Sequence, residues 1–221
     1  MNTFSITEAI KTGWQKTFQN LWLWVGIMIT SGVIYVVLTN LTRNSNGVLN
    51  LILSIASFVI QAIIEIGVIT IALRLLGGQS VKYTDMFNGY PLVWQFLIAT
   101  IVGSVLVVVG LIVFIIPGIY IALRLSQACF LVIDQKLQGI DALKKSWAMT
   151  QGHAMQLLLL AIAFALINMV GAVALLIGLL VTIPTTTIAM AFVYRKLSTG
   201  AFPLQTIPAA AVAAPLPPTL S

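Results

Sequence analysis

The sequence contains few charged side chains. Only 7% of its 221 residues are charged, and 60% are hydrophobic. Soluble domains carry about 25% charged residues, so this chain has too little charge to cover a water-facing surface. The composition therefore predicts an integral membrane protein. The net charge of +6 comes without the basic patch and interleaved aromatics typical of nucleic-acid binding, so we expect no nucleic-acid partner.

Cysteine and histidine are also scarce, with one residue of each. Cys129 alone excludes an internal disulfide and a cysteine-rich metal site, and its apolar neighbours indicate a small buried side chain. His153 lacks the partner ligands that a histidine-based metal site needs. The sequence also shows no catalytic Ser/His/Asp constellation, Walker loop or glycine-rich dinucleotide loop. We therefore expect no enzyme activity, no metal and no cofactor.

Long apolar runs make up most of the chain. Residues 21–39 and 48–76 each have the length of one bilayer crossing, which takes roughly 20 residues. Residues 91–133 and 154–194 are too long for one helix, and we expect two crossings in each. The pattern therefore predicts an all-α polytopic protein with six transmembrane helices.

Glycine and proline are the expected turn and kink residues of the two longest runs. In the first run the turn is predicted at Gly110 or at Pro117-Gly118, and in the second Gly178 and Pro184 take the corresponding roles. Pro117 and Pro184 are predicted to kink or break their helices, because proline removes a backbone hydrogen bond. Broken helices form the binding sites of some transporters.

The basic side chains are unevenly distributed between the two ends of the six predicted helices. Arg43 lies at one end, and Arg124 lies in or near a span. The other end carries Lys11, Lys16, Arg74, Lys82, Lys136, Lys144, Lys145, Arg195 and Lys196. Basic loops stay in the cytoplasm, so both termini are predicted there. The Pro/Ala-rich residues 200–221 are predicted to form a disordered cytoplasmic tail, because such proline density opposes a regular helix.

Two short motifs recur in the chain. "EAIKTGW" (8–14) reappears as "DALKKSW" (141–147), and "IALRL" occurs at 71–75 and 121–125. A weaker middle copy of the first motif is "TDMF" (84–87). This self-similarity indicates a duplicated helical hairpin in three parallel copies, each preceded by an interfacial amphipathic helix. The predicted membrane domain covers 1–199, with units of about 5–78, 79–135 and 136–197.

The first motif has the features of a helix that lies on the membrane surface. Ser5 and Glu8 form a capping-box start, and apolar residues follow at helical spacing. The predicted lipid contacts are Lys11, Trp14, Lys16, Lys144, Lys145 and Trp147. The helices act either as plain anchors or as a collar for anionic lipid headgroups or a partner protein. A second copy of the chain is a further partner to consider.

Polar residues are spaced along one face of two predicted spans. They are Ser57, Gln61 and Glu65 in the second span, Tyr120, Arg124 and Gln127 in the fourth, and Asn168 in the fifth. Charged groups in a bilayer face the helix bundle and find partners, so we expect Glu65 and Arg124 to point inward as a pair. Their role is either a structural network or an ion path or polar pocket.

Residues 116–153, "IPGIYIALRLSQACFLVIDQKLQGIDALKKSWAMTQGH", resemble a bacterial family. It comprises the membrane domain found beside glycerophosphoryl diester phosphodiesterases and related uncharacterised inner-membrane proteins. "EAIKTGW" resembles the start of the same family. The resemblance implies a helical inner-membrane domain of unknown activity. No catalytic residue is carried over, because the residues after Gly200 are too few for the phosphodiesterase domain.

The sequence thus predicts a multi-pass protein of the bacterial inner membrane. Its expected role is that of a non-enzymatic scaffold or accessory protein that engages lipids or membrane partners. The alternative is a small transporter or channel that uses Glu65 and Arg124.

Overall fold

A computed structural model describes residues 4–87, 89–173 and 178–201. These residues form helices and turns and no strand, which confirms the all-α prediction for this part of the chain. The predicted tail lies, from residue 202 onward, outside the described residues. The elements are α1 (Ile6–Gln19), α2 (Leu21–Arg43), α3 (Gly47–Leu76), η1 (Tyr83–Phe87), η2 (Tyr90–Leu92), α4 (Val93–Val113), α5 (Ile115–Leu125), α6 (Ala128–Gln135), α7 (Gly139–Met149), α8 (Ala154–Val173) and α9 (Leu179–Ala201).

The start of α1 follows from its first residues. The Ser5 hydroxyl accepts a hydrogen bond from the backbone N–H of Glu8 at 3.3 Å, which satisfies one of the unpaired donors of the first turn. Glu8 adds a negative charge in that turn, where the helix dipole favours it. The predicted N-terminal cap is therefore confirmed.

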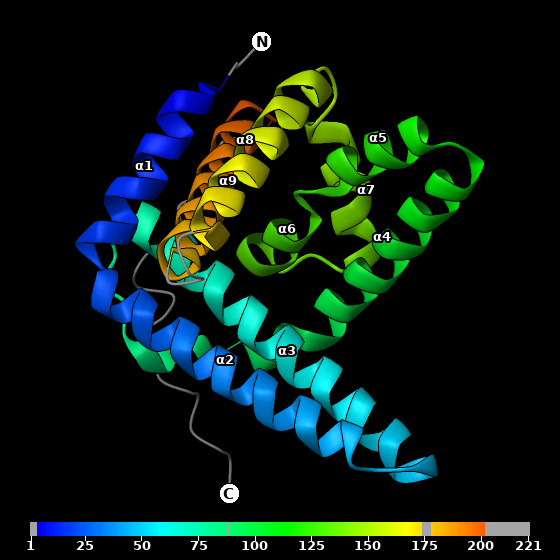
Figure 1. Cartoon of the computed structure of the whole chain (residues 1–221). Coiled ribbons are helices and arrows are strands. Elements are labelled where there is room, and N and C mark those ends of the chain that lie inside the picture. The colour runs from blue at the N-terminus through cyan, green and yellow to red at the C-terminus, as the bar shows by residue number, and fades with distance from the viewer. Residues whose placement is uncertain (1–3, 88, 174–177, 202–221) are drawn as a thin grey trace, which may run out of the picture.

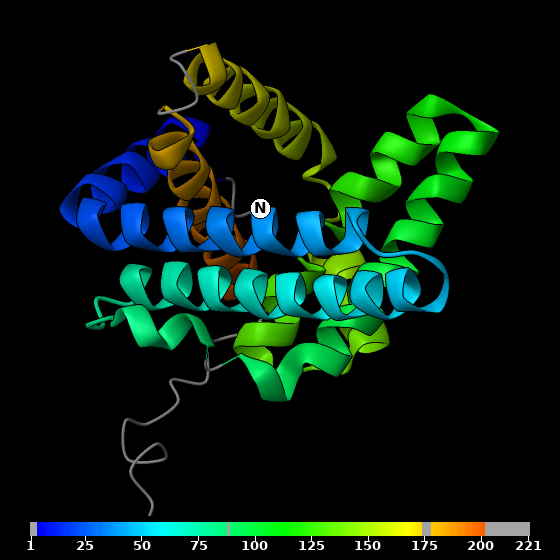
Figure 2. The same cartoon turned by 60° about the horizontal axis from the view of Figure 1, so that its bottom comes forward.

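Three pairs of long helices lie next to each other in the fold. The pairs are α2 with α3, α4 with α5, and α8 with α9, and Figure 1 shows these helices. The α4–α5 pair and the α8–α9 pair point away from each other and from the α2–α3 pair (Figure 2). The helices therefore form diverging hairpins around a shared base.

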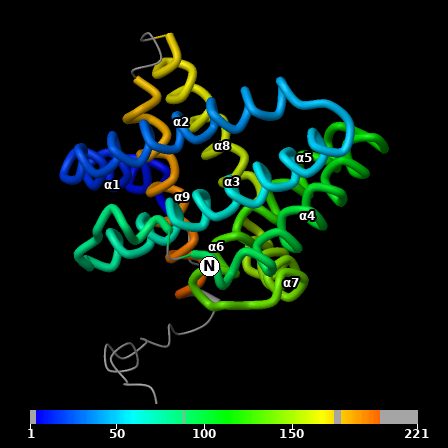
Figure 3. Tube along the Cα trace, turned by 90° about the horizontal axis from the view of Figure 1, so that it is seen from below, coloured from blue at the N-terminus to red at the C-terminus, as the bar shows by residue number. Residues whose placement is uncertain are grey.

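Helix α9 lies at the centre of this arrangement. It contacts α1, α2, α3, α7 and α8, and α1 and α4 lie on opposite sides of it (Figure 3). Ile188 and Tyr194 of α9 are fully buried, as is Trp24 of α2. Most large side chains at the hairpin surfaces are exposed instead, as expected where lipid replaces water around the protein.

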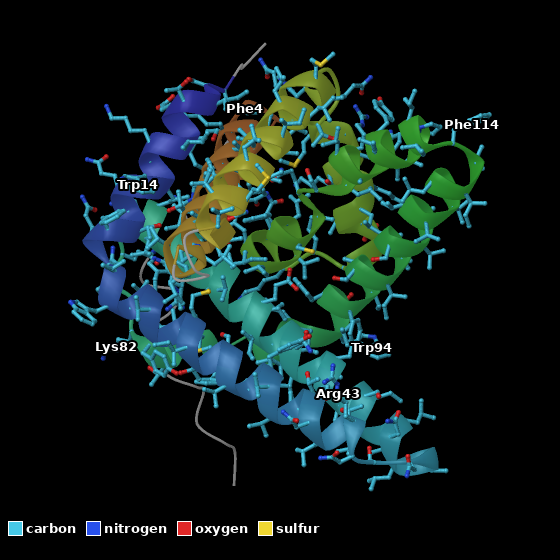
Figure 4. All side chains as sticks on the ribbon, viewed as in Figure 1. Phe4, Trp14, Arg43, Lys82, Trp94 and Phe114 are labelled. Carbon is cyan, nitrogen blue, oxygen red and sulfur yellow. The ribbon has the colours of Figure 1, made fainter. Side chains whose placement is uncertain are left out.

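Helix α1 packs on α9 through its smallest side chains. Ala9, Gly13 and Thr17 form its buried side, and a methyl group on Gly13 would lie 2.3 Å from the carbonyl oxygen of Thr185. The Thr185 hydroxyl donates to that of Thr17 at 3.2 Å. The bulky residue Trp14 lies on the outer side (Figure 4) and is 50% exposed.

The α4–α5 turn lies elsewhere than predicted. Phe114 alone joins the two helices and stands at the tip of the hairpin (Figure 4). The glycines serve close packing below that tip: a methyl group on Gly110 would lie 2.9 Å from the Cα atom of Gly118. Pro117 falls in the first turn of α5, where its missing N–H has no helical partner to lose, so no break occurs there.

The second long run also contains a pair of touching glycines. A methyl group on Gly178 would lie 2.5 Å from the carbonyl oxygen of Gly171, so small residues again let two helices meet closely. Pro184 lies inside α9, and the helix continues through it, which contradicts the predicted break at that residue.

Five segments of the described residues are long and apolar enough to cross a membrane. They are Leu21–Arg43, Gly47–Leu76, Tyr83–Val113, Ile115–Gln135 and Ala154–Val173. Helix α9, the sixth predicted crossing, is not among them. These five segments support a multi-pass membrane protein.

The chain before α4 differs from the predicted amphipathic α-helix. It forms the short 3-10 helices η1 and η2, because η1 is pressed against α3: a methyl group on Gly67 would lie 2.0 Å from the carbonyl oxygen of Met86. Asp85 also pairs with Arg74 at 3.1 Å. The middle motif is therefore a loop held to the end of α3.

Replacing two of the hairpin glycines by alanine should change the stability of the protein in opposite directions. Gly118→Ala places a methyl group 2.6 Å from the backbone nitrogen of Leu111, and overpacking of this kind costs about 1–3 kcal/mol. Gly32 in α2 has no neighbouring atom within 4 Å, so Gly32→Ala should stabilise the helix by up to about 1 kcal/mol. Thermal unfolding in detergent should show a lower midpoint for Gly118→Ala and an unchanged or higher one for Gly32→Ala; equal midpoints would contradict the packing.

Candidate functional site

The break between α5 and α6 creates a polar joint with α7. The carbonyl oxygen of Arg124 accepts hydrogen bonds from the hydroxyls of Ser146 at 2.8 Å and Thr150 at 3.0 Å. The Ser146 hydroxyl in turn accepts from the backbone N–H of Gln127 at 3.2 Å. Both hydroxyl residues are fully buried. Backbone groups freed by the break are thus satisfied by α7; we call these four residues the α5–α7 joint.

The guanidinium of Arg124 lies against two aromatic rings that also contact each other. Its central carbon is 4.7 Å from the centre of the Trp147 ring and 5.6 Å from that of Tyr120. The two rings meet edge to face, with centres 5.9 Å apart. Arg124 is only 3% exposed, and a desolvated cation–π contact is worth about 2 kcal/mol. The rings therefore stabilise the buried charge.

The same guanidinium lacks a hydrogen-bond acceptor among the described residues. Its Nε atom is enclosed and unpaired, and none of the hydrogen bonds or ion pairs of the described chain involves its side chain. All five acidic residues of the sequence lie in that part of the chain. Four are engaged elsewhere: Glu8 with Lys196 (3.9 Å), Asp85 with Arg74 (3.1 Å), Asp141 with Lys144 (4.0 Å) and Asp134 with the Tyr194 hydroxyl (2.7 Å).

The predicted pair of Glu65 and Arg124 does not form. Glu65 lies on the exposed side of α3, because its neighbours Ile66 and Gly67 occupy the buried side, where Gly67 touches Met86 in η1. Helical spacing correctly placed Glu65 on one face with other polar residues. It did not indicate that Glu65 would form no ion pair with Arg124.

The other residues of the predicted polar network are divided among separate places. The Ser57 hydroxyl donates to the Leu53 carbonyl within α3 at 2.7 Å, and Gln61 is exposed. Asn168 in α8 has an enclosed side-chain oxygen without a partner. Gln127 is fully buried, and its Nε2 atom donates to the Ser126 hydroxyl at 3.1 Å. Of the seven, the structure brings together Tyr120, Arg124 and Gln127.

The predicted interfacial residues of α7 mostly face outward. Trp147 is 40% exposed and the Lys144 side chain is 76% exposed, whereas Ser146 is buried on the opposite side. Lys145 differs, because its Nζ atom donates to the Gln135 side chain at 2.6 Å. On α1, Lys11 and Trp14 are exposed, and Lys16 is half-buried.

The metal-ligating and nucleophilic side chains lie apart from one another. No group of three His, Cys, Asp or Glu residues in the described chain is close enough to hold a metal ion. His153 contacts the Gln156 side chain at 3.1 Å, and the Cys129 sulfur lies 3.9 Å from the Thr100 hydroxyl. The first contact lies within one turn of α8, and the second joins α6 to α4.

Ser146 and Thr150 are the site residues that sequence reasoning missed. A signal for Ser146 was present: both copies of the motif carry a small residue before the tryptophan, Gly13 in one and Ser146 in the other. In each copy that residue is buried. A small residue at a repeated position indicates close helix packing, which the apolar stripe alone did not reveal.

No protein-family model, curated protein or solved structure matches this chain. The resemblance of residues 116–153 to the membrane domain found beside phosphodiesterases stays a prediction.

The α5–α7 joint predicts a specific loss in Ser146→Ala. This change leaves the Gln127 N–H without its acceptor and the Arg124 carbonyl with one donor fewer, and an unpaired buried polar group costs about 1–3 kcal/mol. Thermal unfolding in detergent should show that loss, and tryptophan emission should shift as Trp147 loosens. Ser57→Ala is the matched control, because its hydroxyl bonds only within its own helix; a similar loss in both variants would argue against the joint.

Proposed function

We propose that this protein is a six-span protein of the bacterial inner membrane that binds anionic lipid headgroups at its cytoplasmic face. In this proposal it acts without catalysis, as a scaffold or accessory protein. The observation that carries it is the two-sided character of α1 and α7. Each helix buries one side, which in α1 consists of small residues and in α7 also includes Leu143 and Met149, and presents tryptophan and lysine outward, as helices at a membrane surface do.

Helix α9 is the sixth crossing in this proposal. It has 23 residues, enough to span a bilayer, and its only cations, Arg195 and Lys196, lie near its C-terminal end. Its buried threonines Thr182, Thr185 and Thr186 reduce its hydropathy. Because other helices surround α9, these hydroxyls face protein rather than lipid, which polar residues in transmembrane bundles commonly do.

The orientation follows from where the cations are held. The Arg195 guanidinium donates to the Leu73 carbonyl at 2.6 Å, and Arg74 pairs with Asp85, so the C-terminal ends of α3 and α9 meet at one basic base. Arg43 lies toward the far end of the α2–α3 hairpin from Lys82 (Figure 4). The positive-inside rule then places the base and both termini in the cytoplasm, and the three hairpins form parallel repeats.

The rival function is a small transporter or channel that uses Glu65 and Arg124. One observation favours it: Gln61 and Glu65 are exposed one turn apart on α3, where a polar face needs water or a partner. The distance of Arg124 from any carboxylate partner weighs against a shared ion path, so we prefer the lipid-binding role.

Single cysteines test the proposed topology. In a Cys129→Ala background, Asn46→Cys places a thiol at the α2–α3 turn and Lys82→Cys places one at the base. A membrane-impermeant maleimide should label residue 46 in intact cells and residue 82 only after the membrane is opened. The reverse pattern would invert the orientation, and labelling of both in intact cells would show that the hairpin does not cross.

Charge reversal tests the lipid preference. Lys144→Glu should lower the ratio of phosphatidylglycerol to phosphatidylcholine that copurifies from an equal mixture by about fivefold or more, because each basic residue near the surface is worth about 1 kcal/mol. Native mass spectrometry measures this ratio. Arg43→Glu is the control. It makes the same charge change at the opposite end of the protein, away from the proposed cytoplasmic lipid sites, and it should leave the ratio unchanged. An unchanged ratio in Lys144→Glu would count against the lipid collar.

A further inference from the structure

Arg124 is a buried cation whose hydrogen-bonding needs the protein leaves unmet. The guanidinium carries five N–H donors in a planar fork, and the described residues supply an acceptor to none of them. Nε is enclosed and unpaired. The aromatic rings on Tyr120 and Trp147 stabilise a positive charge but replace no oxygen acceptor. The guanidinium is therefore left to find its oxygen acceptor outside the described chain.

The position of Arg124 makes such a partner accessible. Tyr120 and Trp147 are 43% and 40% exposed, so the rings that contact the guanidinium are themselves accessible from outside the protein. Lys144, with its side chain 76% exposed, precedes Trp147 on the same helix by less than one turn. A rotation of the Trp147 ring would bring an anion at the surface of α7 to the guanidinium, without disturbing the backbone joint beneath it.

Phosphate is the anion whose geometry fits this arrangement. Two parallel N–H groups of a guanidinium match two oxygens of a phosphate or carboxylate. All five carboxylate side chains of the chain lie elsewhere, and the phosphate plane of a bilayer lies at the depth that tryptophan prefers.

We infer that Arg124, which lies against Tyr120 and Trp147, binds the phosphate group of one phospholipid at the cytoplasmic surface of the membrane. This inference rests on the proposed function, because it uses the placement of α7 at headgroup depth. It goes further by assigning a single site with a defined chemistry. The lysines of the collar distinguish lipids by net charge, whereas Arg124 recognises the phosphodiester that charged and zwitterionic phospholipids share.

Thermal unfolding of the full chain in detergent tests the site. The additives are short-chain phosphatidylglycerol, short-chain phosphatidylcholine, diacylglycerol with the same chains, and inorganic phosphate. Both phospholipids should raise the unfolding midpoint of the wild-type protein in a saturable way, and diacylglycerol should not. Arg124→Gln should weaken this binding about tenfold or more, because a charge-assisted hydrogen bond is worth that factor. Arg124→Lys keeps the charge without the fork and should bind more weakly than wild type.

The outcomes separate this inference from the proposed function. If inorganic phosphate raises the unfolding midpoint as much as phospholipid does, Arg124 binds phosphate, but its ligand is free phosphate and not a lipid. Equal rises with diacylglycerol and phospholipid would overturn the inference, as would an unchanged lipid response in Arg124→Gln. If Arg124→Gln does not fold, Arg124→Lys decides in the same way. In Lys144→Glu, both phospholipids should still raise the unfolding midpoint, because Arg124 is unchanged. If this variant loses only its preference for phosphatidylglycerol, the result concerns the lipid collar and not the Arg124 site.

Discussion

The hydroxyl of Ser146 makes the contacts on which the candidate site depends. It donates to the Arg124 carbonyl and accepts from the Gln127 N–H, so one side chain satisfies both groups released where α5 gives way to α6. Such groups would be costly if left unpaired in a buried setting. Because Ser146 must face inward, the next residue, Trp147, faces the Arg124 guanidinium. This hydrogen-bond requirement favours the same rotation of α7 as the packing of Ala142, Leu143 and Met149, which are buried with Ser146.

Local signals in the sequence could predict much of the fold, whereas the rotation of helices could not be predicted. The cap at Ser5 and the outward lysine and tryptophan of α7 follow from nearby residues. That Glu65 forms no pair with Arg124 could not be predicted from helical spacing, because the position of α3 also depends on η1, whose Met86 backbone occupies the space beside Gly67. The turn at Phe114 was equally hidden, since no polar residue marks it and the glycines nearby serve contact between helices.

The two clear copies of the motif share a register but pack on different partners. In α1 the residue before tryptophan is Gly13, and the helix lies against Thr185 of α9. In α7 the equivalent residue is Ser146, which bonds to the α5–α6 break. Against a continuous helix, whose carbonyls are already paired, glycine only needs to allow close contact. Against a broken helix, a hydroxyl can also form hydrogen bonds with the unpaired backbone groups. The repeated position is thus constrained to be small, and its chemistry follows the partner helix.

The energy balance at Arg124 indicates what kind of partner it lacks. Burying a cation away from water is unfavourable, and a desolvated cation–π contact returns about 2 kcal/mol. Two rings therefore offset much of the cost of the charge itself. They do not satisfy the N–H donors, and each unpaired buried donor costs about 1–3 kcal/mol. The Arg124 guanidinium thus lacks hydrogen-bond acceptors rather than stabilisation of its charge. A phosphate supplies several acceptor oxygens, whereas a third aromatic ring would supply none.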